Sequence, residues 1–285
     1  MGHPMARNLA SAGFHIVAHD ADSDALMRAC DATGAEAPGE LEAAAERCEA
    51  VITMLPDGDA VRAAVLGPGG RGDCLLAGFS RGSVLVDMSS SSPVGTRELG
   101  ARLAERGVAM LDAPVSGGVR KAADATLSIM VGGDARSIAR CRALFEAIGK
   151  QIFIAGPLGS GHAMKALNNY VSSAGLIAVV EALLIGRKFG LDPALMADIL
   201  NASSGKNNTT EGKLKQFIIS ETFADGFPLR LMAKDVRTAD DMAHSLGIAT
   251  PMADLCAQLW AAAAQALDER ANHTQVLRYM EGLGR

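Results

Sequence analysis

Residues 159–169 read Gly159-Ser160-Gly161-His162-Ala163-Met164-Lys165-Ala166-Leu167-Asn168-Asn169. Two glycines open this stretch, and apolar residues then continue with helical periodicity to Ile185, which predicts one long helix. Lys165 and Asn169 stand four residues apart and therefore share a face of that helix. A lysine is seldom fully buried without a partner, so this pair either faces water or lies in a cleft for a chemical purpose. The stretch alone leaves both interpretations open.

Short apolar segments alternate with helical segments upstream of this stretch. They predict strands at 14–19, 50–55, 84–88 and 109–111 and helices at 4–12, 25–33 and 40–47. Such alternation is typical of βαβ units around a parallel sheet, in a doubly wound α/β domain. Downstream of Gly156 only helical periodicity recurs, at 162–185, 193–203, 208–220, 229–246 and 251–268. The second half is therefore predicted to be all-helical.

The composition narrows the class of protein. Of the 285 residues, 49% are hydrophobic and 21% are charged, a balance typical of soluble globular proteins. The net charge of −5, without a long run of Lys or Arg, gives no support to a nucleic-acid or membrane-surface role. The five cysteines and six histidines are scattered, which predicts a reducing compartment and no metal site. With no signal-peptide pattern and no charge-free apolar run of spanning length, we expect a cytoplasmic protein.

Polar and turn residues follow the predicted strands at the edge where open parallel sheets bind their ligands. They are Asp20, Leu55-Pro56, Ser89-Ser90 and Ser116-Gly117-Gly118. An Asp at the end of the second strand of a dinucleotide site accepts the ribose hydroxyls and repels a 2′-phosphate. No Arg follows Asp20 in the turn, which favours NAD over NADP. The alternative is that Asp20 only forms the turn.

Three stretches give the sequence a family resemblance when they are taken together. They read DAPVSGG at 112–118, continuing to TLSIMVGG at 126–133, then GSGHAMKALNN at 159–169, and finally MAKDV at 232–236. In this order and spacing they resemble the substrate, catalytic and late motifs of the β-hydroxyacid dehydrogenase family, which includes 3-hydroxyisobutyrate dehydrogenase and tartronate semialdehyde reductase. The similarity runs over essentially the whole chain.

The resemblance implies two domains and an activity. A Rossmann-like dinucleotide-binding domain would occupy 1–157, and an all-helical domain for substrate binding and oligomerisation would occupy 158–285. The implied enzyme is an NAD(P)-dependent dehydrogenase that interconverts a small, anionic β-hydroxyacid and its semialdehyde. It would form homodimers or homotetramers through the helical half, consistent with the apolar helices at 174–185 and 261–266.

The resemblance also implies the substrate-binding residues. Lys165 would be the general acid that protonates the carbonyl oxygen in the reduction and the base in the oxidation. Asn169, one helical turn along, would orient the substrate and the lysine. Ser116, Gly117 and Gly118 would hold the substrate carboxylate through hydroxyl and backbone N–H donors, where glycines let the backbone approach an anion closely. The alternative for Gly117 and Gly118 is a tight turn without a ligand.

For the cofactor, the resemblance implies a second set of positions. Leu55, Pro56 and Ser90 match positions that line the nicotinamide and ribose, and Lys234 would close on the cofactor side of the cleft. The alternative for Lys234 and the adjacent Asp235 is a solvated pair on a helix surface.

The sequence departs from the family pattern at its start. Such proteins begin with a strand and a GxGxxG loop, whose first two glycines make the pyrophosphate turn. Here Gly2 corresponds to the third glycine, and the strand with the rest of the loop is missing from the sequence. We expect a translation start assigned to an internal Met, and a truncated chain is the alternative. In addition, Ala125 stands where the family often has Gly.

Other functions remain open from the sequence. An imine or keto-acid reductase on the same scaffold is one, although the presence of Lys165 and Asn169 argues against imine reduction, which does not need this lysine. A catalytically silent family member that acts as an oligomeric scaffold is another. Arg120 and Lys121 suggest a polar or doubly anionic acid as the substrate. The segment Asn207-Asn208-Thr209-Thr210 and Lys213 are candidates to reach the cleft from the helical half.

Overall fold

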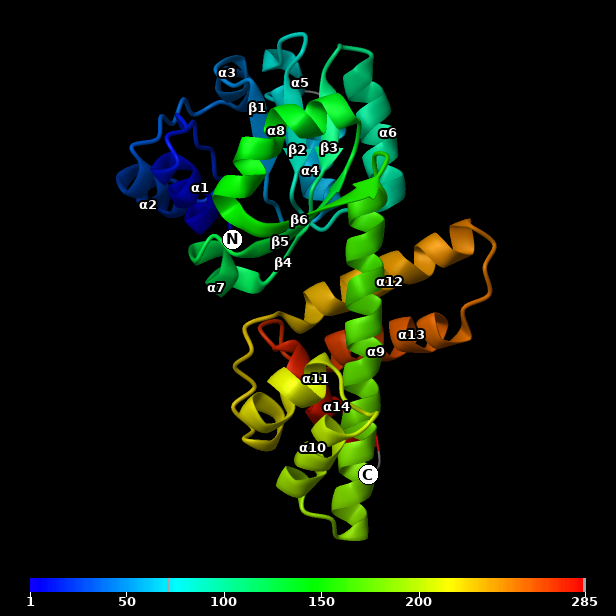
Figure 1. Cartoon of the computed structure of the whole chain (residues 1–285). Helices are drawn as coiled ribbons and strands as arrows, with labels where there is room; N and C mark the ends of the chain where they lie inside the picture. The colour runs from blue at the N-terminus through cyan, green and yellow to red at the C-terminus, as the bar shows by residue number, and fades with distance from the viewer. Residues whose placement is uncertain (71, 284–285) are drawn as a thin grey trace. The chain divides into compact units, whose positions relative to one another are not determined.

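The computed structural model describes residues 1–70 and 72–283. The chain divides into two compact units, Met1–Lys165 and Ala166–Arg285. The long helix α9 (Ser160–Phe189) begins in the first unit and continues into the second (Figure 1). This helix confirms the one predicted from the glycines to Ile185. The division lies past the boundary predicted after residue 157, and the domain limits stay a prediction.

The first unit contains a six-stranded sheet with the order β1-β2-β3-β5-β4, in which β6 also pairs with β5. The strands are β1 (Ala50–Thr53), β2 (Val84–Asp87), β3 (Ala109–Asp112), β4 (Val115–Ser116), β5 (Leu127–Gly132) and β6 (Gly149–Gly156). The β1–β2 and β2–β3 pairs are parallel, as predicted, and so is the β5–β6 pair, but β5 runs antiparallel to β3 and β4. The sheet is mixed because the chain folds back after β3 through β4 and a short helix, without a long crossover.

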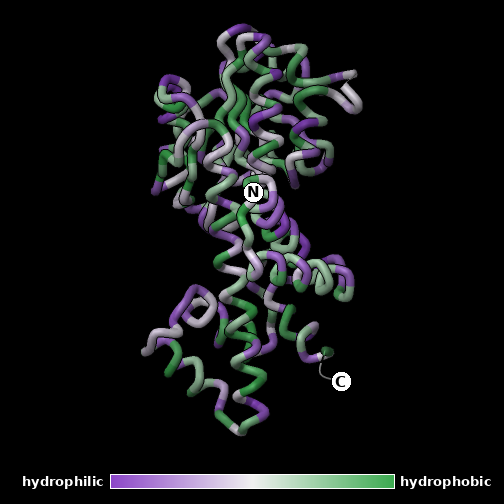
Figure 2. The backbone as a smooth tube through the Cα atoms, turned by 90° about the vertical axis from the view of Figure 1, so that its right-hand side faces the viewer, coloured by the Kyte–Doolittle hydropathy of each residue, from purple (hydrophilic) through white to green (hydrophobic). Residues whose placement is uncertain are grey.

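Helices cover this sheet on both faces. They are α1 (Gly2–Ser11), α2 (Ser23–Thr33), α3 (Leu41–Glu46), α4 (Gly58–Leu66), η1 (Pro68–Gly70), α5 (Leu75–Gly78), α6 (Pro93–Ala104), α7 (Gly118–Ala123) and α8 (Ala135–Ile148). Val84 and Val86 pack into one core cluster, and Leu85 between them packs into the other, because successive strand residues point to opposite faces. Apolar segments lie inside the unit and hydrophilic segments lie over its surface (Figure 2).

The strand predicted at 14–19 is wrong. The segment makes one isolated bridge, Val17 to Glu36, with hydrogen bonds from Ala18 N to Glu36 O (2.8 Å) and from Glu36 N to Ile16 O (3.0 Å). Among the described residues no strand extends this pairing into a ladder. Phe14 and Ile16 nevertheless pack, partly buried, against the core of the unit. The alternation of apolar residues here thus reflects partial burial of the side chains and not a regular strand.

The second unit is all-helical, as predicted. After α9 it contains α10 (Pro193–Ala202), α11 (Asn208–Gly212), a π-helix η2 (Leu214–Ile219), α12 (Leu229–Ser245), α13 (Pro251–Ala266), η3 (His273–Gln275) and α14 (Val276–Leu283). The single helix predicted at 208–220 is divided at Lys213. Side-chain caps from Asp192 and Asn207 start α10 and α11.

Helix α9 supplies much of the core of this unit. Leu176, Val180 and Leu183 pack with the fully buried Trp260 of α13. By length and composition alone, α9 is long and apolar enough to cross a membrane, but 44% of its apolar window is buried inside the protein. The apolar character of α9 is therefore explained in part by its place in the protein core.

Candidate active site

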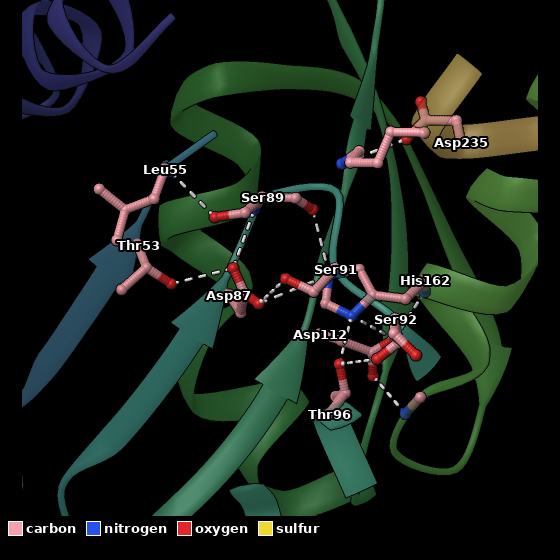
Figure 3. A network of polar contacts seen from close by, with 12 residues as sticks. Thr53, Leu55, Asp87, Ser89, Ser91, Ser92, Thr96, Asp112, His162 and Asp235 are labelled. Carbon is pink, nitrogen blue, oxygen red and sulfur yellow. Dashed lines mark hydrogen bonds and ion pairs between the residues drawn. The ribbon is translucent and has the colours of Figure 1, made fainter. Parts of the chain in front are cut away.

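Asp87, the last residue of β2, organises the loop that follows this strand. Its side chain is 1% exposed, and it accepts hydrogen bonds from Thr53 Oγ1 (3.0 Å), the Ser89 backbone N–H (2.9 Å) and Ser91 Oγ (2.7 Å). Thr53 is the last residue of the neighbouring β1, so one buried carboxylate ties together the carboxyl ends of two strands (Figure 3). Three donors on a buried carboxylate offset the cost of removing it from water.

Ser89 brings the predicted cofactor residues of two loops close together. Its hydroxyl accepts a hydrogen bond from the Leu55 backbone N–H (2.9 Å), which holds the loop after β1 beside the loop after β2. Leu55 and Ser90 are half-buried, and Pro56 is exposed. The predicted positions Leu55, Pro56 and Ser90 therefore lie along one edge of the sheet, at the carboxyl ends of β1 and β2.

Asp112, the last residue of β3, fixes the beginning of α9. This fully buried carboxylate accepts hydrogen bonds from the backbone N–H groups of Gly159 and His162, both at 2.7 Å. A carboxylate at a helix N-terminus satisfies otherwise unpaired N–H groups and interacts favourably with the helix dipole. Gly161 permits this close approach, because a Cβ there would collide with the backbone oxygens of Met130 and Asp112. The helix that carries Lys165 is thereby anchored to β3.

His162 lies between these two carboxylates. Its ring is buried, with Nε2 3.1 Å from the Ser89 carbonyl oxygen and Nδ1 2.8 Å from Thr96 Oγ1 (Figure 3). Sequence reasoning gave no role to His162 or to Asp87. The signals for them were present, since Asp87 precedes a run of serines at a predicted strand end and His162 stands inside the organising stretch.

Lys165 and Asn169 lie one turn apart on α9, and both are buried, at 8% and 6% exposure. The interpretation as a pair that faces water is therefore wrong. Asn169 Nδ2 donates to Asp235 Oδ2 (2.5 Å), and Asn169 Oδ1 accepts from Asn168 Nδ2 (3.0 Å). Asn169 thus keeps one amide hydrogen beyond the donation to Asp235.

Lys234 lies on α12 next to the same carboxylate. Its Nζ is 3.3 Å from Asp235 Oδ1, and Asp235 is 4% exposed. The alternative of a solvated surface pair is therefore wrong for Asp235. Through this buried carboxylate the second unit brings Asn169 and Lys234 together, and Asp235 is a further residue that the sequence interpretation left without a role.

Ser116, Gly117 and Gly118 form the passage from β4 into α7. Ser116 pairs with Ser128 of β5, and Gly117 and Gly118 have φ angles of 132° and 67°, a region that favours glycine. Both glycines are exposed, so their backbone groups face solvent. Ala125, which stands where the family often has Gly, also has a positive φ of 53°.

Gly2 and Asp20 occupy the remaining predicted cofactor positions. Gly2 is the first residue of α1, and a Cβ placed on it would lie 4.0 Å from Met54 Cβ, just beyond β1. Asp20 is exposed, and its Oδ1 accepts from the Asp22 backbone N–H (2.9 Å). Asp20 therefore does form the turn, through one of its two carboxylate oxygens.

Among the described residues, one cluster of possible metal ligands contains none of the predicted site residues. Asp240 and His244 of α12 and Asp254 of α13 place their ligand atoms within 4.8 Å of one another. Burial, and next the neighbouring Asp254, raise the pKa of the Asp240 carboxyl. This group of two carboxylates and one imidazole was not predicted from the sequence.

Comparison with known proteins places the chain. Residues 1–156 match the model of the NAD-binding domain of 6-phosphogluconate dehydrogenase, and residues 159–280 match that of the NAD-binding domain of NADP-dependent 3-hydroxyisobutyrate dehydrogenase. The chain belongs to the β-hydroxyacid dehydrogenase family. The resemblance and the fold class predicted from the sequence are confirmed, and this dehydrogenase is an NAD(P)-dependent oxidoreductase.

Individual relatives are similar to this dehydrogenase along nearly its whole length. The NAD-dependent L-serine dehydrogenase of Pseudomonas aeruginosa is 38% identical over 91% of this chain and 88% of its own. The 3-hydroxyisobutyrate dehydrogenase of the same organism is 37% identical over 93% and 90%. The solved structure of Mycobacterium tuberculosis 3-hydroxyisobutyrate dehydrogenase with L-serine is 31% identical, covers 98% of this chain and 95% of its own, and superposes with a TM-score of 0.88.

Proposed function

We propose that this dehydrogenase interconverts a small β-hydroxyacid and its semialdehyde, with Lys165 as the acid and base. The observation that carries the proposal is the buried Lys165 on a helix whose first turn is fixed by Asp112 to the carboxyl end of β3. An ammonium held in place near a ligand-binding sheet edge can give a proton to a developing alkoxide, and the amine can remove it in the reverse direction. The similarity to hydroxyacid dehydrogenases supports this chemistry.

In this proposal the other predicted residues bind and orient the substrate. The Ser116 hydroxyl and the backbone N–H groups of Gly117 and Gly118 bind the carboxylate, because their positive φ angles leave the backbone open to an anion. Asn169 uses its remaining amide hydrogen to orient the hydroxyl or carbonyl group, while Asp235 holds its carboxamide in place.

The residues at the sheet edge fit a dinucleotide. Ser89 holds the loops with Leu55, Pro56 and Ser90 side by side, and the exposed Asp20 carboxylate keeps an oxygen beyond its turn contact. We assign Gly2, at the start of α1, and Lys234 to the same binding role. When bound, NAD supplies the acceptor or donor of the hydride. The Asp20 charge supports a preference for NAD over NADP.

The substrates of relatives and the charges near the proposed carboxylate site both bear on the substrate class. The relatives act, by their names, on L-serine, 3-hydroxyisobutyrate and 2-(hydroxymethyl)glutarate. Arg120 and Lys121 are exposed on α7, two and three residues after Gly118, so their charges favour a substrate with a second anionic group. NADH formation from these three hydroxyacids at equal concentration tests the choice, with Lys165→Ala as the control. Failure to oxidise any of them, together with no NADH binding, would support the silent scaffold instead.

We further propose a cytoplasmic homodimer or homotetramer. The surface of α9 carries large exposed apolar side chains, among them Val171, Ile185 and Phe189. Exposed apolar clusters of this kind are typical of protein interfaces. Light scattering coupled to size-exclusion chromatography measures the assembly, and a monomer at micromolar concentration would contradict it.

A further inference from the structure

The imidazole of His162 makes polar contacts with several elements of the first unit. It stands on α9, reaches the Ser89 carbonyl oxygen after β2 (3.1 Å) and Thr96 Oγ1 on α6 (2.8 Å), and is 1% exposed. The carboxylates of Asp87 and Asp112 lie 3.7 and 3.8 Å from its ring nitrogens (Figure 3). Four separate segments of the first unit therefore meet at one side chain.

Hydrogen-bond chemistry assigns a proton to Nε2 of this ring. The Ser89 carbonyl oxygen can only accept, so Nε2 donates to it. Nδ1 lies 2.8 Å from Thr96 Oγ1, whose hydroxyl can donate to it as well as to the Ser92 carbonyl oxygen at 2.9 Å. A ring with a hydrogen-bond partner at each nitrogen is held in one orientation, which an apolar side chain would not be.

The contacts of His162 connect the loops proposed to bind the cofactor with the helix that carries Lys165. On one side, Ser89 holds Leu55 through its hydroxyl and precedes Ser90, both proposed cofactor positions. On the other side, Lys165 follows His162 by three residues on α9, and residues at this spacing are neighbours on a helix surface. A shift of the imidazole therefore moves the lysine against the loops that line the cofactor.

We propose that His162 is a positioning residue for the reaction: it sets the distance between Lys165 and the cofactor loops at Leu55 and Ser90. This proposal rests on the proposed function of Lys165. Asp112 caps α9 through backbone N–H groups, and Asp87 holds the Ser89 loop through three donors, so each part keeps its own structure without the imidazole. The imidazole adds the link between the two parts.

The test compares His162→Ala with His162→Gln in steady-state oxidation of the hydroxyacid that the wild type prefers. We expect His162→Ala to lower kcat about 10- to 100-fold with the KM for NAD⁺ changed less than about threefold, because a small misplacement of a catalytic group has effects of this size. Glutamine can donate to the Ser89 carbonyl oxygen through its amide nitrogen and accept from the Thr96 hydroxyl through its amide oxygen. It should therefore restore kcat to within about threefold.

A second pair of variants keeps the test decisive if His162→Ala does not fold. Thr96→Val removes the partner of Nδ1 at nearly constant volume, and Thr96→Ser keeps it. We expect kcat to fall about three- to tenfold in the first and to stay near wild type in the second. Equal kcat values in Thr96→Val and Thr96→Ser would overturn the proposal, as would an unchanged kcat in His162→Ala or a loss of kcat that glutamine does not restore.

The same measurements separate this inference from the proposed function. A wild type that oxidises no hydroxyacid, or a Lys165→Ala variant as active as the wild type, would refute the role of Lys165 and the inference with it. An active wild type that depends on Lys165, with no dependence on His162 or Thr96, would refute only the inference.

Discussion

We expect acid to destabilise the helical unit because of the buried imidazole of His273. Its ring is fully buried, Nδ1 donates to the Phe227 carbonyl oxygen (3.1 Å), and Nε2 accepts from Lys213 Nζ (2.9 Å). Burial, and next the Lys213 charge, lower the pKa of this imidazole from 6.5 to about 3. Asp225 Oδ2, 3.4 Å from Nε2, favours the charged ring, but protonation would cost the hydrogen bond from Lys213. His273 is therefore neutral in the folded unit.

The size of the acid effect follows from the two protonation equilibria. In the unfolded chain His273 takes up a proton as the pH falls through 6.5, whereas the folded unit resists it down to about pH 3. The unfolded state thus binds more protons in this window, so stability is lost as the pH falls. Between pH 7 and pH 5 the loss is about 2 kcal/mol, which lowers the urea midpoint by about 1 M at a slope of about 2 kcal/mol per M.

The assay uses the single tryptophan of the sequence. Trp260 is fully buried in the core of the second unit, so its fluorescence reports the unfolding of the unit that contains His273. Urea titrations at pH 7 and pH 5 are compared for the wild type and His273→Gln, whose carboxamide oxygen can still accept from Lys213. His3→Gln, at an exposed position of the first unit, is the matched control.

The outcome is read from the change in midpoint between the two pH values. His273→Gln should lose about 1 M less than the wild type, whatever its stability at pH 7, and His3→Gln should follow the wild type. An equal acid shift in the wild type and His273→Gln would refute the argument, because the ring would then titrate alike in the folded and unfolded states.

Three further predictions concern the first unit and the reaction. Lys165→Ala should lower turnover by at least about 100-fold while the dissociation constant of NADH, from fluorescence titration, changes less than about threefold. Asp112→Asn should lower the free energy of unfolding, measured by urea titration, by about 2–4 kcal/mol, since one of two acceptors of buried N–H groups is lost. Asp134→Asn, at the N-cap of α8, is the control and should lower it by about 1 kcal/mol or less in the same titration. Asp20→Ser should narrow the ratio of NADPH to NADH dissociation constants by about tenfold. An unchanged ratio would leave Asp20 with its turn role only.

The periodic parts of the fold were predictable from the sequence, and the pairing of strands was less so. Strands β1, β2 and β3 and the long helices follow from apolar runs and their Gly and Pro breaks. The antiparallel β5 could not be inferred in this way, because direction depends on the connection through β4 and α7. In the segment 14–19 the apolar pattern predicted a strand that does not form: apolar side chains of this segment are partly buried, but its backbone forms one bridge.

Among the site residues, local motifs identified positions but not the contacts that support them. Asn169 and Lys234 were predicted from separate motifs, whereas Asp235, which contacts both, was considered only in the alternative of a surface pair. A carboxylate between two motif residues is visible only when helices α9 and α12 are packed together. Sequence spacing therefore locates the groups that touch ligands more readily than the groups that hold them.

Asp112 belongs to the proposed substrate-binding motif but supports the helix of the catalytic motif. It opens the motif at 112–118, whose serine and glycines are proposed to bind the substrate, yet its own carboxylate accepts from Gly159 and His162 at the start of α9. Two motifs that are far apart in the sequence are thus joined by one buried side chain, with no linear signal for the contact. Substitution of Asp112 should therefore disturb Lys165 on α9 more than the Gly117–Gly118 turn, which depends on its own φ angles and not on this carboxylate.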